Sequence, residues 1–189
     1  NPSNVEPVSE NILKKNLAEA TELCQIAVDA APTVARSRLL LARTKAIAEN
    51  YSSAEALLAS LVDSEYSPAF AYLGAIYSNK ENIKGYDLTV AETWYLKGCE
   101  RDNGASCSGL AWLYSNNISF LKTDAEQLVL FEKACELGDP TGCASIGTEH
   151  LWGENLVNRS ADVAISRLKE GCESSESWAC SHLGDLFLG

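Results

Sequence analysis

KGCERDNGASCSGL, residues 97–110, carries two cysteines, Cys99 and Cys107, eight positions apart. The same interval returns in two further pairs, Cys135 with Cys143 and Cys172 with Cys180. Successive pairs are separated by steps of 36 and 37 residues. A pair that recurs at a fixed step indicates a repeated structural unit, a repeated metal site or a repeated catalytic site.

Residues around the cysteines keep the same step, so the repeat extends beyond them. One column holds Leu73, Leu110, Ile146 and Leu183, and the next holds Gly74, Ala111, Gly147 and Gly184. Three positions further on come Tyr77, Tyr114, His150 and Phe187. Ahead of the first cysteine of each pair, Tyr95, Phe131 and Leu168 align. This period is typical of a solenoid built from supersecondary units.

Each unit is predicted to contain two helices. The first has apolar residues at helical spacing, as in AFAYLGAIY, residues 69–77, and the second is amphipathic, as in residues 124–138. Thr123 or Asp124, and Ser160, are expected to cap second helices at their start. The small residue in the Gly74 column is expected to let a second helix approach closely.

Upstream the same organisation continues without cysteine pairs. We expect helices over residues 10–32, 34–50 and 52–62, with Leu39 standing 34 residues before Leu73. The fold class predicted is therefore all-α. Residues 1–66 are assigned to N-terminal helices and 67–189 to the regular repeats, as one continuous solenoid. The repeat units expected are 67–103, 104–139, 140–176 and a partial unit, 177–189.

These columns resemble the SEL-one-like repeat (SLR), a relative of the tetratricopeptide repeat (TPR). AYLGAIY at 71–77 and AETWYLKGC at 91–99 match the family pattern, while Ala111 replaces its Gly and His150 its Tyr. The resemblance implies a right-handed superhelical α/α solenoid, with SLR units over 67–189 and degenerate TPR-like units over 10–66. The cysteine pairs are similar to those of a cysteine-rich bacterial subgroup, whose members are periplasmic or secreted and carry one disulfide per repeat.

Helix geometry bears on the cysteine pairs. Eight residues along one helix separate Cα atoms by about 12 Å, whereas a disulfide needs roughly 4.4–6.8 Å. A bridge therefore requires the chain to reverse, and the intervening segments are rich in turn-forming residues. Zinc sites favour cysteines two to four positions apart, and redox catalysis favours C-x-x-C. We therefore favour three structural disulfides, in an oxidising compartment, over a metal site.

Other candidate chemical residues are few. Cys24 lies among apolar residues and is expected to be a buried free thiol, with a nucleophilic role as the alternative. His150 and His182 are expected to pack or lie at the surface rather than to catalyse. The chain contains no G-x-S-x-G, H-E-x-x-H or phosphate-loop motif. We therefore expect no catalytic residues, no metal and no cofactor.

The charge of the chain restricts its partners. The formal net charge is −11, and 46% of the residues are hydrophobic, without a run long enough to span a membrane. Such a surface repels nucleic acid and anionic lipid. It keeps a protein in solution and also suits a partner with a basic surface. The chain starts at Asn1 and contains no Met, so we expect it to be trimmed from a longer precursor, with any signal peptide removed.

Solenoids bind partners through a concave face lined by first helices. Outward columns of these helices are expected to place five residues there: Tyr72, Trp112, Thr148, Trp152 and Asp185. The alternative is that the two tryptophans cover packing between repeats.

The function predicted is a non-catalytic module that binds a protein or peptide, as an adaptor, a regulator, a virulence factor or an immunity protein against a secreted toxin. Two alternatives remain. Some cysteine-rich SLR proteins are associated with β-lactams, so the resemblance allows weak β-lactam binding or hydrolysis, although the chain lacks S-x-x-K. The other alternative is a structural spacer in an envelope assembly.

Overall fold

The computed structural model describes residues 16–80, 85–116, 123–152, 160–174 and 176–188; for residues 187 and 188 only the backbone is described. Over these ranges the chain is all-α. Its helices are α2 Leu17–Ala30, α3 Ala35–Ile47, α4 Tyr51–Val62, α5 Pro68–Ser78, α6 Leu88–Cys99, α7 Gly104–Ser115, α8 Asp124–Glu136, α9 Pro140–Trp152, α10 Ala161–Glu173 and α11 Ser177–Leu188. They pack pairwise as an α/α repeat solenoid, which confirms the predicted fold class.

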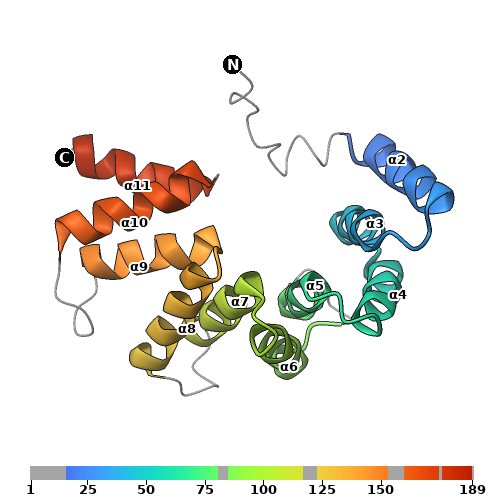
Figure 1. The fold of residues 1–189 in the computed structure, drawn as a ribbon, viewed down its shortest axis with the longest axis horizontal. Coiled ribbons are helices and arrows are strands. Elements are labelled where there is room, and N and C mark those ends of the chain that lie inside the picture. Colours follow the sequence, from blue (N-terminus) through green and yellow to red (C-terminus); the bar gives the residue numbers. More distant parts are fainter. Residues whose placement is uncertain (1–15, 81–84, 117–122, 153–159, 175, 189) are drawn as a thin grey trace.

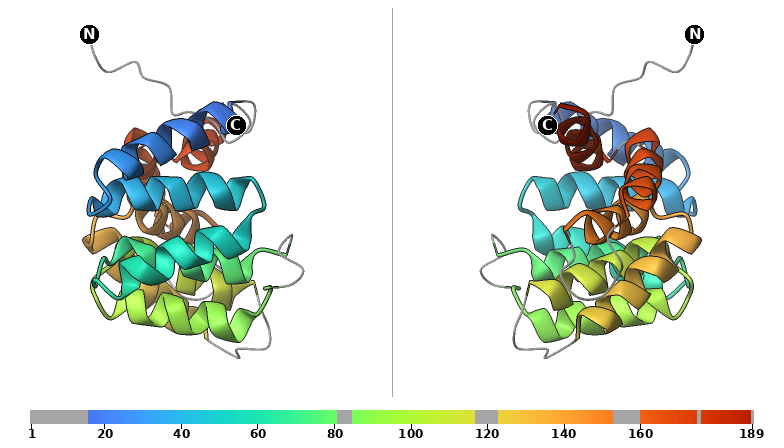
Figure 2. Two further views of the ribbon diagram at one scale, coloured as in Figure 1. Left: turned by 90° about the vertical axis from the view of Figure 1, so that its right-hand side faces the viewer. Right: turned by 90° about the vertical axis from the view of Figure 1, so that its left-hand side faces the viewer.

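The helix pairs follow an arc (Figure 1). First helices α3, α5, α7 and α9 lie on its inner side, and second helices α4, α6 and α8 lie on its outer side (Figure 1). The side views in Figure 2 place α2 and α11 at the same height, at the open end of the arc. The described part of the chain is therefore a U whose concave face is lined by first helices.

Capping residues set the starts of several helices. Thr123 forms a capping box with Glu126 at the start of α8, and the Ser160 side chain accepts a hydrogen bond from the Val163 N–H of α10. Ser160 is the predicted cap, and of the two predicted candidates Thr123 and Asp124 the cap is Thr123. Asn103 caps α7 in the same way, through the Ser106 N–H. Each cap satisfies a backbone donor that the first turn of a helix otherwise leaves unpaired.

The turns that follow α4, α6 and α8 share one backbone conformation. Glu65, Asp102 and Gly138 lie two or three residues beyond the ends of these second helices and have φ values of 56°, 54° and 80°. A left-handed residue after a helix reverses the chain and lets its N–H groups reach the last carbonyls. In the second of these turns the Asn103 N–H donates to the Gly98 carbonyl at 3.0 Å. The reversal predicted between the paired cysteines is therefore present.

Small residues bring the helices into contact. The ring of Tyr95 on α6 fits between α5 and α7, because a Cβ on Gly74 would lie 2.5 Å from it and one on Gly109 only 2.3 Å. Gly147 on α9 meets Leu168 on α10 in the equivalent way, at 2.9 Å. Gly74 and Gly147 thus let a second helix approach closely, as predicted for their column, because a side chain of that helix occupies the space of the missing Cβ. Gly184 is the exception, with no atom within 4 Å of its would-be Cβ.

The N-terminal register differs from the one expected from sequence. Leu41 and Ala42 are buried on α3, as Leu73 and Gly74 are on α5, whereas Leu39 is only half-buried. The step between α3 and α5 is therefore 32 residues rather than 34. The run of leucines at 39–41 offers three registers, and packing against α4 selects the last. Residues 10–15 of the expected first helix lie outside the described residues.

A tyrosine–carboxylate pair links each of two repeats to the second helix before it. Tyr77 donates to the Glu55 carboxylate, and Tyr114 donates to Glu92 at 2.7 Å, both across 22 residues. In the next repeat, the positions 22 residues apart hold His150 and Leu128. In this repeat the tyrosine donor and the carboxylate acceptor are thus both replaced, so position 128 does not hold a carboxylate that lacks a tyrosine partner. Phe187, the fourth member of the column, lies outside the described side chains.

The two glycines Gly147 and Gly184 allow a matched test of helix packing. Gly147→Ala is expected to lower the free energy of unfolding by about 1–3 kcal/mol, because the methyl group meets Leu168 and the backbone of α10. Gly184→Ala is expected to leave stability unchanged or to raise it by up to about 1 kcal/mol, since alanine favours the helix. Urea denaturation followed by circular dichroism measures both, and equal losses would contradict the packing assigned to Gly147.

The tyrosine pairs predict a loss of stability at alkaline pH. Burial, the hydrogen bond to Glu55 and the charges of Glu55 and Asp87 raise the pKa of Tyr77 from 10.0 to about 12. Its contribution is therefore fully present below pH 10 and lost as pH rises from 10 to about 12. Denaturation at pH 9 and 11.5 in a Cys24→Ser background, which lacks the free thiol, is expected to show a smaller decline for Tyr77→Phe. An identical decline in both proteins would rule out this linkage.

Candidate functional site

The six paired cysteines form three disulfides, each joining a second helix to the first helix that follows. Their Cα–Cα distances are 4.7 Å for Cys99–Cys107, 4.6 Å for Cys135–Cys143 and 4.7 Å for Cys172–Cys180. Each bridge spans the reversing turn between two repeats. The stretch 97–110 is therefore a joint: Cys99 is the last residue of α6, and Cys107 lies one turn into α7. Three disulfides indicate an oxidising compartment.

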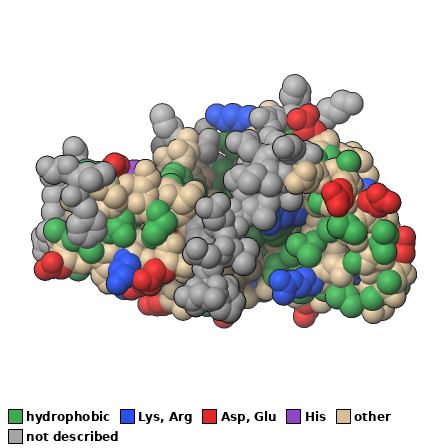
Figure 3. All heavy atoms as spheres, turned by 90° about the horizontal axis from the view of Figure 1, so that it is seen from above, with side chains coloured by type: hydrophobic (Ala, Val, Ile, Leu, Met, Phe, Trp, Pro, Cys, Tyr) green, Lys and Arg blue, Asp and Glu red, His purple; other side chains and the backbone are tan. Residues whose placement is uncertain are grey.

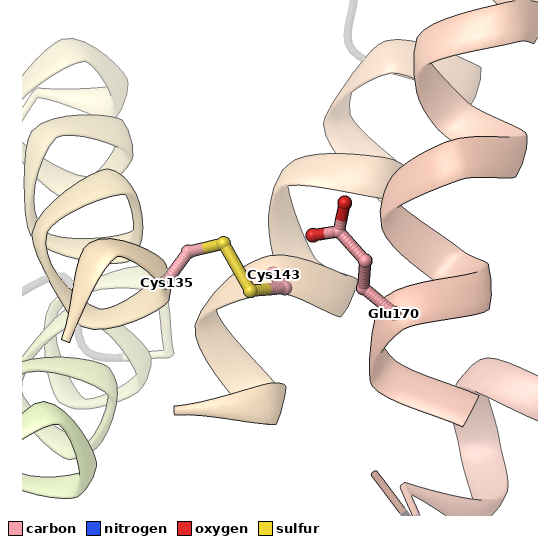
Figure 4. A group of neighbouring side chains, drawn as sticks. All are labelled: Cys135, Cys143 and Glu170. Carbon is pink, nitrogen blue, oxygen red and sulfur yellow. A yellow bond between two sulfur atoms is a disulfide. The ribbon is translucent and has the colours of Figure 1, made fainter. Parts of the chain in front are cut away.

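One disulfide has a carboxylate beside it. Among the described residues, Cys135, Cys143 and Glu170 bring their potential ligand atoms within 4.8 Å of one another (Figure 4). Both sulfur atoms are bonded to each other, and Glu170 pairs with Arg167 at 2.9 Å. A metal-binding cysteine must be a thiolate, so this oxidised cluster offers a single carboxylate to a cation. Its geometry fits a structural joint.

Cys24 is the one cysteine outside the disulfides. It lies on α2 and is half-buried, so the expectation of a buried side chain is wrong. The reason is its place in the array: α2 packs on α3, and the helix buries no residue fully. Burial still raises the pKa of the Cys24 thiol. A raised pKa keeps the thiol protonated and disfavours a nucleophilic role.

Four rings from three first helices gather on the concave side. We name Trp112 of α7, Trp152 of α9, and Trp178 and His182 of α11 the concave aromatic cluster. Ring centroids are 6.4 Å apart for Trp112–Trp178, 5.8 Å for Trp178–His182 and 4.9 Å for Trp152–His182. All three contacts are edge-to-face, a favourable arrangement for aromatic pairs. The Trp112–Trp178 contact joins α7 directly to α11, past α9.

The cluster combines internal packing with exposure. Trp112 also packs on Phe131 of α8, with centroids 6.1 Å apart, yet it remains 44% exposed. Trp152 is 53% exposed. Large aromatic side chains that are held by neighbours and still reach solvent are the residues that protein interfaces use as anchors. The sequence left two alternatives for the tryptophans, partner binding and cover for packing between repeats. Both fit, because one part of each ring packs against neighbouring side chains and another part is exposed to solvent.

A groove adjoins the cluster. It is a cavity of about 450 Å³ between α5 and α7, with Tyr95 of α6 at its floor and Trp112 on its wall. Lys80 lies at its α5 side, and Asp139 and Thr141 lie at the start of α9. A volume of this size holds one or two side chains of a bound peptide. Figure 3 looks onto this concave side, where hydrophobic side chains lie over both arms of the arc.

Polar contacts fix the groove walls. Ser108 donates to the Asp139 carboxylate, which also accepts from the Gly142 N–H at 3.2 Å. Thr141 donates to Glu176 at 2.9 Å, linking the starts of α9 and α11. The hydroxyl groups of Tyr95 and Ser78 are 3.4 Å apart, and burial raises the pKa of Tyr95. These bonds leave the groove with a preformed shape.

The structure separates the five predicted contact residues. Trp112, Trp152 and Asp185 are exposed. Thr148 is half-buried, and its hydroxyl donates to the Ser145 carbonyl at 2.7 Å. Tyr72 does not face outward as expected: it is half-buried and packs against the core cluster of α3, α4 and α5.

Trp178 and His182 were not among the residues predicted for this surface. Trp178 occupies the same repeat position as Ala105 and Thr141, which line the groove. His182 follows it by four residues, one helical turn along the same face. The sequence contains a signal for this surface: Trp178 is an aromatic residue in a column of small residues, and a second ring, that of His182, follows four positions later.

No protein-family model matches the chain. Two curated relatives are cytochrome c oxidase assembly factor 7A of Xenopus laevis, 24% identical over 147 residues, and cytochrome c oxidase assembly factor 7 of Xenopus tropicalis, 23% identical. In both cases the match covers 75% of this chain and 64% of the relative. The chain thus spans less than two thirds of the length of these relatives.

Solved structures share the fold. A Sel1 repeat protein from Oxalobacter formigenes superposes with a TM-score of 0.66 at 17% identity, over 93% of this chain and 73% of that one. A protective antigen of uropathogenic Escherichia coli with an SLR fold gives 0.62 at 23% identity, over 88% and 36%. The chain therefore has the SLR fold, with disulfide-bonded repeats. None of the described helices has the length and apolar character of a membrane span.

The joints predict a defined loss of stability. Replacing both Cys99 and Cys107 by serine is expected to lower the free energy of unfolding, because the disulfide restricts the unfolded chain. The expected loss is roughly 2–3 kcal/mol, since a short closed loop gives a smaller stabilisation than a long one. Cys24→Ser is the matched control and is expected to change stability little, since its side chain is half-buried. Thiol titration of the denatured, unreduced protein is expected to find one thiol, Cys24. More than one would contradict the three disulfides.

Proposed function

We propose that this protein is a non-catalytic interaction module that binds a protein or peptide partner through its concave face. The observation that carries the proposal is the concave aromatic cluster, whose tryptophans are 44% and 53% exposed at Trp112 and Trp152 while edge contacts hold the rings in place. A rigid aromatic group loses little conformational freedom on binding. The groove beside Trp112 gives a partner side chain a place to enter.

The compartment proposed is the periplasm or the secreted space of a bacterium, within the cysteine-rich SLR subgroup. The three disulfides support an oxidising environment. The name assembly factor, carried by two relatives, is in keeping with a binding role. An adaptor, a regulator, a virulence factor or an immunity protein against a secreted toxin would each use the same concave contact.

Two alternatives make different predictions. A β-lactam-hydrolysing enzyme would turn over a chromogenic cephalosporin with saturation kinetics, and we expect no such turnover. A structural spacer would have no partner that depends on concave residues. The interaction proposal requires a partner that does.

Trp112→Ala tests the proposal directly. Affinity capture from cells that express the protein is expected to lose its main partner with Trp112→Ala, because truncation of an interface tryptophan costs about 2 kcal/mol or more. Val129→Ala is the matched control, since Val129 is an exposed apolar residue on the outer helix α8. Trp152→Ala provides a second concave variant. A partner retained equally by all three variants would refute concave binding.

Circular dichroism and thiol counts must match wild type for each variant, so that a folding defect is not taken for lost binding. If Trp112→Ala lowers stability through its contact with Phe131, Trp152→Ala still decides the outcome, because Trp152 is the more exposed ring.

A further inference from the structure

Charge is distributed unevenly over the first helices that line the concave face. Helix α3 carries four basic residues and no acidic one. Helices α5 and α7 carry no charged residue, and α9 and α11 each contribute one carboxylate, Glu149 and Asp185. From α5 onward, the Lys and Arg residues within the described helices all lie on second helices, at Lys97, Lys133, Arg167 and Lys169. The inner face therefore changes from basic to acidic along the array.

The charged groups that matter reach solvent on this face. With the step of 32 residues, Arg43 of α3 occupies the repeat position of Ala75, Trp112, Thr148 and Asp185. Arg43 and Asp185 are both exposed. Arg36, seven residues before Arg43, is exposed on the same side of α3. Glu149 contributes less, because burial and, after it, the charge of Asp124 on α8 raise the pKa of its carboxyl group.

The groove repeats this polarity on a smaller scale. Lys80 lies on its α5 side, and Asp139 lies on its α9 side. Figure 3 shows basic side chains at the hollow between the two arms of the arc. Two independent features, the series of helices and the groove walls, thus have the same order of charge.

We propose that the concave face binds an extended peptide segment with separated charges, whose acidic residues face α3 and whose basic residues face α9 and α11. This proposal rests on the proposed function and names the partner of the same site. At the acidic end Trp152 of α9, and beside it Trp112 of α7, offer ring surface to a Lys or Arg side chain by a cation–π contact. The chain already uses such a contact elsewhere, with Lys97 4.8 Å from the centroid of Trp94.

The length of the segment follows from helix spacing. Packed helices lie about 10 Å apart, so the path from α3 to α11 over five first helices is about 40 Å. An extended chain covers this distance with about 12 residues at about 3.3 Å each. Charge at the two ends and neutral residues between them match the uncharged inner helices α5 and α7.

The probes are fluorescent synthetic peptides of about 12 residues. The bipolar probe has a block of glutamates, a Ser-Gly spacer and a block of arginines, and it is made with the blocks in both orders to cover both backbone directions. Two control probes replace either the glutamates or the arginines by glutamine. Fluorescence anisotropy with the full, oxidised chain measures the Kd of each. We expect a bipolar probe to bind more tightly than both controls.

Variants assign each charge to its end. Arg43→Gln is expected to weaken the bipolar probe about two- to fivefold, the usual size of one exposed ion pair, and to leave the probe without glutamates unchanged. Asp185→Asn is expected to do the reverse, weakening only probes that contain arginines. Lys169→Gln, on the exposed surface of α10, is the control for a general change in net charge and is expected to affect no probe.

Some outcomes overturn the proposal. The first such outcome concerns the control probe in which glutamine replaces the glutamates and the arginines remain. If this probe binds as tightly as the bipolar probe, and if Arg43→Gln strengthens its binding, the site selects basic peptides and not peptides with separated charges. If Lys169→Gln has the same effect on probe binding as Asp185→Asn, the net charge of the protein, and not the concave face, determines the affinity. The proposed function is judged separately: a captured partner that depends on Trp112 but binds through a segment without separated charges refutes the polarity and leaves concave binding intact.

Discussion

The fold depends on one packing constraint, the requirement that each second helix fit between two first helices. Tyr95 meets it with a ring that touches α5 at Gly74 and α7 at Gly109. Both contacts need a missing side chain: Gly74 admits the second helix of its own repeat, and Gly109 admits the second helix of the repeat before it. Where Ala111 adds a methyl group, it packs in the core with Phe131 and Ile146. Because this packing recurs in each repeat, the residues that form it recur in the sequence every 36–37 positions.

The joints turn local packing into an overall shape. A left-handed residue reverses the chain after α4, α6 and α8, and a disulfide closes three successive turns between repeats. Because the same turn recurs, the repeats rotate in one sense, and α7 comes to lie against α11 through Trp112 and Trp178. The concave face and its aromatic cluster are thus results of the joints, as much as of the side chains that line it.

Features that depend on one repeat can be predicted from the sequence, whereas features that depend on several repeats cannot. The period, the caps at Thr123 and Ser160 and the exposure of Trp112 follow from helical spacing within a unit. Tyr72 was predicted to face outward, but it packs against the core cluster of α3, α4 and α5, and its own helix does not encode that contact with neighbouring helices. Trp178 and His182 meet rings two repeats and one repeat away, so only the curvature of the array reveals that they belong to the same surface.

The disulfides are confined to residues 99–180, and upstream the chain has the single thiol of Cys24. The two arms of the U therefore differ mechanically. The arm with α7 to α11 is cross-linked at every joint and braced by the Trp112–Trp178 contact, whereas the arm with α2 to α4 is held by packing and hydrogen bonds, without a covalent cross-link. A partner entering the U would meet a stiff wall that carries the acidic and aromatic groups and a compliant wall that carries the arginines, so closure on the partner would come from the N-terminal arm.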